Sequence, residues 1–120
     1  MLRDFLLVGI GGALGSMARY GLTLLASYAS IASEVGTFAA NAIGSLLIGI
    51  IIALSKGDWY LLGAVGFCGG FTTFSTFSAQ ALHLLQSSQR TMGVLYIFAS
   101  LLVCILMTWA GMALADKFLK

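Results

Sequence analysis

The amino-acid sequence predicts an all-α membrane protein with four transmembrane helices. Sixty per cent of its 120 residues are hydrophobic and only 8% are charged, whereas about a quarter of the residues of a soluble domain are charged. Long uncharged runs separate the few charges, and a helix needs about 20 apolar residues to cross a hydrocarbon core ~30 Å thick. A β-barrel would require short alternating strands and polar turns, and the runs show no such alternation.

Three uncharged runs are long enough to span the membrane as they stand, and they lie at 35–55, 59–89 and 91–115. A further span, the first in the chain, requires a helix that begins near Asp4 and includes Arg19. We therefore expect helices at about 4–27, 36–55, 59–87 and 91–116. Only a few residues connect them, so residues 1–120 are expected to form a single four-helix transmembrane domain.

The first two helices carry small residues at a spacing that lets helix backbones approach closely in lipid. Helix 1 contains a Gly-x-x-x-Gly pair at Gly11 and Gly15, and helix 2 contains Ala40, Gly44 and Gly49. Since four helices leave little room for a polar pathway inside one subunit, we expect the chain to oligomerise through such faces.

The third span is longer than one membrane crossing requires, because its uncharged run of about 31 residues would extend ~46 Å as a single helix. Its glycine pair, Gly69-Gly70, lies ~18 Å along the helix from Trp59, near the middle of the membrane. Hydroxyl residues follow the pair. One interpretation is a helix broken at this depth, where backbone carbonyls can coordinate an ion. The other is an intact helix whose hydroxyls bond to preceding carbonyls.

Polar side chains within the predicted spans indicate candidate sites, because an amide or a charge in lipid is costly. Asn41 lies in helix 2, and Arg19 lies ~22 Å along helix 1, where it could reach the interface or attract anions. Phe71, Phe74 and Phe77 recur at every third residue. This stripe is either packed or lipid-facing, or it presents positive ring edges to a small anion.

The residues do not suggest an enzyme. The sequence has no nucleophile–base pair, metal-ligand cluster or phosphate-binding loop, and we expect its single histidine, His83, near the membrane interface. Cys68 and Cys104 lie in apolar runs and are expected to behave as small hydrophobic residues. A scattered net charge of +2 does not favour a nucleic-acid partner. The residues alone therefore predict a small-anion or other ion pathway.

The segment from Gly66 to Ser78, Gly-Phe-Cys-Gly-Gly-Phe-Thr-Thr-Phe-Ser-Thr-Phe-Ser, closely resembles small bacterial fluoride channels of the Fluc (CrcB) type. The resemblance extends along the chain. Helix 1 contains Gly-Gly-x-x-Gly and ends in Ala-Arg, and helix 2 contains Gly-Thr-Phe-x-x-Asn-x-x-Gly. It implies a fluoride-selective channel for passive fluoride export across the bacterial cytoplasmic (inner) membrane. It also implies an antiparallel, dual-topology dimer, formed by two copies or with a paralogous subunit.

The same resemblance implies roles for individual residues. Phe74 and Phe77 would form a phenylalanine box along the fluoride pathway, and Asn41 would be its amide donor. The carbonyls of Gly69 and Thr72 from both subunits would bind one structural Na⁺ at the dimer interface. A polar track would continue through Ser75, Thr76, Ser78 and Thr108, with Arg19 as the candidate for an anion vestibule. The chain departs from the family at Gln80, usually glutamate, and at Cys104, where a serine is expected.

The alternative function is a small dual-topology multidrug or cation exporter, which has a similar length and number of helices. Such a transporter needs a membrane-embedded carboxylate in helix 1 to exchange protons for cations. The only acidic residue near helix 1 is Asp4, at its very start. A structural subunit of a larger membrane complex, which would not transport ions by itself, is a third interpretation.

Overall fold

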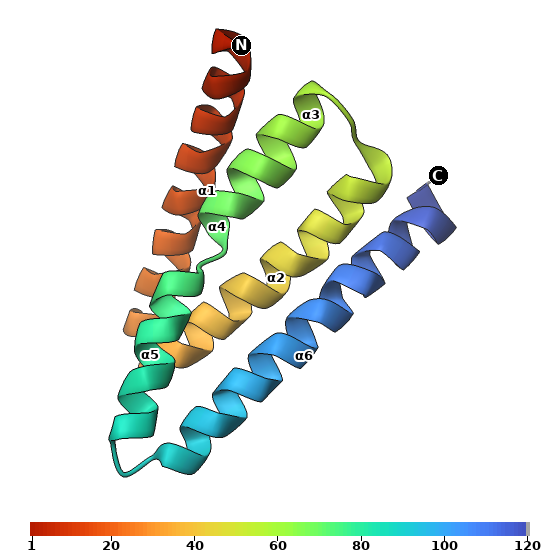
Figure 1. Ribbon diagram of the computed structural model, residues 1–120. Coiled ribbons are helices and arrows are strands. Elements are labelled where there is room, and N and C mark those ends of the chain that lie inside the picture. Colours follow the sequence, from red (N-terminus) through yellow and green to blue (C-terminus); the bar gives the residue numbers. More distant parts are fainter. Residues whose placement is uncertain (120) are drawn as a thin grey trace.

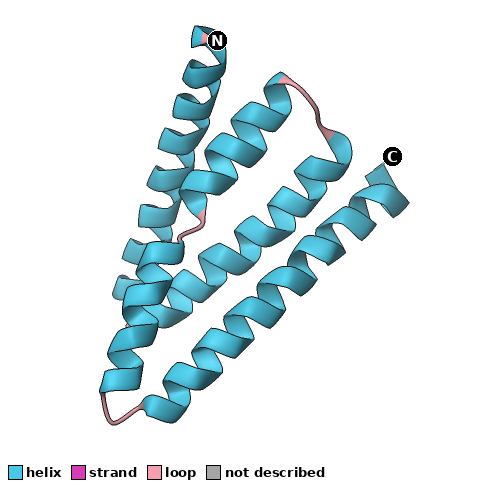
Figure 2. Cartoon of the chain, viewed as in Figure 1, coloured by secondary structure: helices cyan, strands magenta, loops and turns pink. Residues whose placement is uncertain are grey.

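The computed structural model describes residues 1–119, which are helical apart from short connections (Figure 2). Four helical stretches are long and apolar enough to cross a membrane: Leu2–Tyr28, Ser33–Leu54, Asp58–Gln86 and Arg90–Leu119. The structure therefore confirms the predicted all-α architecture with four candidate spans. Many large apolar side chains are exposed along them, as expected for helices that face lipid.

The four spans contain eight helical elements. The first two spans are α1 (Leu2–Tyr28) and α2 (Ser33–Leu54). The third contains α3 (Asp58–Tyr60), the π-helical η1 (Leu61–Cys68), α4 (Gly69–Phe71) and α5 (Phe74–Gln86). The fourth contains α6 (Arg90–Leu114) and the π-helical η2 (Ala115–Leu119).

Between α4 and α5 the backbone is extended for two residues. Thr72 has φ −84° and ψ 159°, and Thr73 has φ −149° and ψ 122°. Their side chains satisfy groups near the helix ends: the Thr72 hydroxyl donates to the Cys68 carbonyl at 2.7 Å, and the Thr76 amide donates to the Thr73 hydroxyl at 3.2 Å. The glycine pair at 69–70, where the sequence placed the candidate break, is helical instead.

The helices pack as two close pairs, α1 against η1 and α4, and α2 against α6 (Figure 1). Glycines permit both approaches. A Cβ at Gly11 or Gly15 would overlap backbone carbonyl oxygens of η1. A Cβ at Gly49 of α2 would overlap the Thr108 carbonyl oxygen of α6, and one at Gly111 would overlap a carbonyl oxygen of α2. The small residues predicted to be packing faces thus bring backbones into direct contact.

The N-terminus, the α2–α3 connection and the C-terminal end of the fourth span lie at one end of the bundle in Figure 1, and the α5–α6 connection lies at the other. An ion pair between Arg3 and Asp58 joins α1 to α3 at the first of these ends. A small core lies towards the opposite end, where Phe77, Ala81 and Leu84 of α5 pack with Tyr96 of α6.

Candidate functional site

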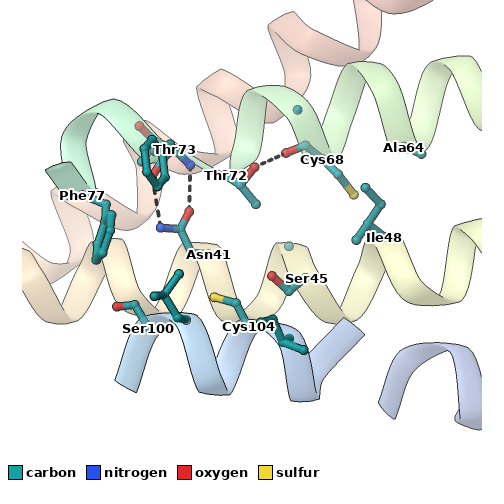
Figure 3. Close-up of a pocket in the computed structure, with 15 residues that line it drawn as sticks. Asn41, Ser45, Ile48, Ala64, Cys68, Thr72, Thr73, Phe77, Ser100 and Cys104 are labelled. Atoms are coloured by element: carbon teal, nitrogen blue, oxygen red, sulfur yellow. Dashed lines mark hydrogen bonds between the residues drawn. The ribbon is translucent and has the colours of Figure 1, made fainter. Parts of the chain in front are cut away.

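A cavity of about 360 Å³ lies beside the extended segment, between α2, the third span and α6 (Figure 3). Its walls are mainly apolar, and its polar groups come from the backbone near the extended segment and from a few uncharged side chains. The lining residues are Asn41, Gly44, Ser45, Ile48, Ala64, Cys68, Gly69, Thr72, Thr73, Phe74, Phe77, Ser100, Leu101, Cys104 and Ile105. Five of the residues predicted from the sequence therefore meet at one cavity: Asn41, Gly69, Thr72, Phe74 and Phe77.

Asn41 pairs with the backbone of Thr73 on both sides of its amide group (Figure 3). The Thr73 N–H donates to Asn41 Oδ1 at 2.7 Å, and Asn41 Nδ2 donates to the Thr73 carbonyl at 3.0 Å. A primary amide carries two N–H donors, and Thr73 uses one of the two that Asn41 has. The side chain thus supports the extended backbone and has one N–H donor that the Thr73 carbonyl does not use.

The extended segment changes the partners of the carbonyls at the end of α4. In a continuous α-helix the amide of Thr73 would donate to the Gly69 carbonyl, but here it donates to Asn41. The amide of Thr72 still donates to the Cys68 carbonyl at 3.0 Å. The Gly69 carbonyl, which belongs to a residue of the cavity wall, therefore lacks its regular helical donor.

Arg19 reaches this region from α1. Its Nε donates to the Gly70 carbonyl at 3.1 Å, and the residue is half-buried. Arg19 is absent from the residues that line the cavity. The structure thus connects this residue to the backbone of the third span rather than to the cavity wall.

The two phenylalanines of the predicted box differ in their surroundings. Phe77 is buried against Tyr96, with ring centroids 5.1 Å apart. Phe74 is 74% exposed, and its ring centroid lies 5.7 Å from that of Phe77 at an interplanar angle of 44°. The tilt presents a ring edge rather than two stacked faces. One ring is therefore packed in the core, and the other is exposed on the single chain.

The structure does not gather the predicted polar track in one place. Ser75 and Ser78 are exposed on α5. Thr76 lines a separate cavity of about 330 Å³ between α1, α2 and α5, together with the side chain of Gln80. Thr108 donates to the Cys104 carbonyl of its own helix at 3.0 Å and is absent from the cavity linings described above. Within one chain these four residues do not form a continuous line.

Sequence reasoning assigned no role to Thr73 or Tyr96, and the structure also shows the surroundings of Ser100, a polar residue of the fourth predicted span. Thr73 is the partner of Asn41 and the N-cap of α5, and a threonine immediately before a helix is a recognisable signal for that role. Ser100 is 6% exposed, lines the main cavity, and its hydroxyl has no hydrogen-bond partner among the described residues. Tyr96 donates its hydroxyl to Gln80 Oε1 at 2.8 Å, a pairing of residues on different helices that no local pattern indicates.

Both cysteines are free and line the same cavity, Cys68 fully buried and Cys104 partly. Among residues 1–119 there is no cluster of three or more His, Cys, Asp or Glu side chains that could hold a metal ion. Besides the two thiols, the polar groups that the cavity offers are backbone groups and uncharged side chains.

Comparison with known proteins gives a consistent result along the chain. Residues 6–112 match the model of the CrcB-like protein family, described as camphor resistance (CrcB). The fluoride-specific ion channel FluC 1 of Yersinia pseudotuberculosis is 37% identical, over 98% of both chains. The channel named FluC of Bacteroides fragilis is 38% identical over 98% of this chain and 99% of its own. That of Thermus thermophilus is 41% identical over 92% and 93%.

Proposed function

Since this chain belongs to the CrcB-like protein family, we propose that it is the subunit of a fluoride-selective channel that exports fluoride passively across the bacterial cytoplasmic membrane. The observation that carries the proposal is its similarity, over nearly the whole chain, to relatives named as fluoride-specific ion channels. The four candidate membrane spans agree with a multi-pass protein of that membrane.

The chemistry of the main cavity supports conduction of a small anion. Its lining contains no charged residue, so an anion would be held by neutral donors and would not be trapped by an ion pair. Asn41 keeps one amide donor, and the buried Ser100 hydroxyl lacks a protein partner. The tilted rings of Phe74 and Phe77 can turn positive edges towards the ion.

The extended residues Thr72 and Thr73 would interrupt the third span near the middle of the membrane. The helical run before them, Asp58–Phe71, and the 13-residue α5 after them are each about 20 Å long. Extended backbone at this depth must be buried in protein or line a polar cavity, and Asn41 and the main cavity provide both conditions.

The functional unit would be an antiparallel dimer of two copies inserted in opposite orientations. The cavity is much larger than one halide ion, and Phe74 projects beside it without burial in its own chain. A second copy would cover both, and a paralogous subunit is the alternative partner.

We expect a C-terminal reporter on this chain, expressed alone, to give signal on both sides of the membrane. A strictly cytoplasmic signal without fluoride flux would indicate that a paralogous subunit is required.

One sodium ion would hold the two subunits together at the two-fold axis. The Gly69 carbonyl has lost its helical donor, and the Thr72 carbonyl follows it beside the same cavity. Two such carbonyls from each subunit would surround the ion with oxygen, as at other interrupted membrane helices.

We expect fluoride flux to fall when choline replaces sodium throughout the preparation, and to return when sodium is restored. A flux that is indifferent to sodium would contradict this site.

Fluoride efflux from liposomes that contain only this purified protein tests the function directly. We expect fluoride to leave down its gradient while chloride is retained, measured with ion-selective electrodes. Efflux of a hydrophobic cation driven by a proton gradient, without fluoride efflux, would instead identify an exporter. The structure disfavours that outcome, because Asp4 is exposed in the first turn of α1 and not embedded in the bundle.

A further inference from the structure

The interruption of the third span leaves backbone groups on both sides that a continuous helix would satisfy. Asn41 of α2 accepts from the Thr73 amide, which a continuous helix would pair with the Gly69 carbonyl, and also donates to the Thr73 carbonyl at the N-cap of α5. On the other side, the Gly70 carbonyl would accept from the Phe74 amide in a continuous helix. It accepts from Arg19 Nε of α1 instead. Buried backbone groups without a partner are costly, so each of these side chains replaces one backbone bond that the interruption removes.

Arg19 is placed at this carbonyl by the packing of α1. Gly11, Gly15 and Arg19 are spaced by four residues and therefore share one face of α1. The two glycines bring that face into backbone contact with η1. Contact continues to the end of α4, since a Cβ at Gly70 would lie 3.1 Å from the Ser16 amide nitrogen of α1. One turn after Gly15, Arg19 lies where the helical run ends.

The charge of the guanidinium suits this position. The last carbonyls of a helix carry partial negative charge, which a basic side chain stabilises by hydrogen bonding and through the helix dipole. A hydrogen bond from a charged donor is also stronger than one between neutral groups. Arg19 is thus matched in both geometry and charge to the carbonyl end of the run Asp58–Phe71.

We infer that Arg19 is a positioning residue that caps the first half of the third span and so holds Thr72 and Thr73 extended. It acts on the backbone of the proposed ion pathway and not as a charge that attracts anions. The effect on fluoride conduction rests on the proposed function, whereas the effect on the backbone does not. The two can therefore be measured separately.

Hydrogen–deuterium exchange of the full-length protein in lipid nanodiscs tests the inference. For Arg19→Met we expect amides of residues 72–76 to exchange about tenfold faster or more, because a charged hydrogen bond to the interruption is lost. Exchange in the middle of α6 should not change, and Arg19→Lys, which keeps a charged donor, should restore part of the protection. Arg90→Met is the matched control: it removes the same charge from an exposed helix start and should leave residues 72–76 as in the wild type.

Fluoride flux from liposomes is measured on the same variants, and we expect Arg19→Met to conduct about tenfold less or worse. Reduced flux with unchanged exchange at residues 72–76 would overturn the inference and identify Arg19 as an anion-attracting charge. If Arg19→Met unfolds, so that exchange rises along the whole chain, Arg19→Ala, which also lacks a donor, decides: selective deprotection of 72–76 supports the cap, and wild-type protection refutes it. Selective deprotection in a protein that conducts no fluoride even as wild type would retain the cap and reject the channel.

Discussion

Replacing Phe74 with isoleucine should reduce fluoride flux by about 10- to 100-fold, the effect of raising a barrier by ~1.4–2.8 kcal/mol. Isoleucine keeps an apolar side chain of substantial bulk but lacks the positive ring edge that can face an anion. Phe74 is 74% exposed in the single chain, so the change removes little packing within the subunit. Liposome flux normalised to the amount of assembled protein measures the effect.

Phe98→Ile is the matched control, since Phe98 is an exposed phenylalanine of α6 that does not line the main cavity. It should conduct as the wild type does. Phe77→Ile should also reduce flux, but it removes a ring packed against Tyr96, so its thermal stability must be compared as well. Normal conduction by both Phe74→Ile and Phe77→Ile would mean that the two rings serve packing only.

Gly15→Ala should destabilise the protein by about 3 kcal/mol or more, the upper range for overpacking a core. The added Cβ would overlap the Phe67 carbonyl oxygen and lie 2.9 Å from the Phe71 amide nitrogen. Both are backbone atoms, which cannot rotate away as a flexible side chain could. We expect a clear fall in the temperature at which the detergent-solubilised protein aggregates, with loss of flux because α1 no longer supports η1 and α4.

Gly21→Ala provides the control on the same helix, because a Cβ at Gly21 would meet nothing within 4 Å in the chain. Alanine favours helix over glycine by about 0.5–1 kcal/mol, so this variant should be as stable as the wild type or slightly more so. Equal stability of Gly15→Ala and Gly21→Ala would show that α1 does not approach η1 as closely as the structure has it.

The sequence by itself determined the class of the protein and its family. The thickness of the hydrocarbon core sets the length of an apolar helix, so three uncharged runs and a first apolar stretch that includes Arg19 sufficed to predict four spans, and four candidate spans are present. The segment from Gly66 to Ser78 sufficed to indicate the family, which the full-length comparisons confirm. Both inferences depend on residues that are contiguous in the chain.

Only the tertiary structure decided where the backbone of the third span leaves the helix. Glycine propensity favoured positions 69 and 70, yet these are helical and the extended residues are Thr72 and Thr73. The physical reason is that Asn41 and Arg19, from two other helices, form hydrogen bonds with the backbone beside the extended residues. These bonds lower the free-energy cost of leaving the helix at that point. No local pattern contains those partners, because they are brought together by the close packing of α1 and α2 against the third span.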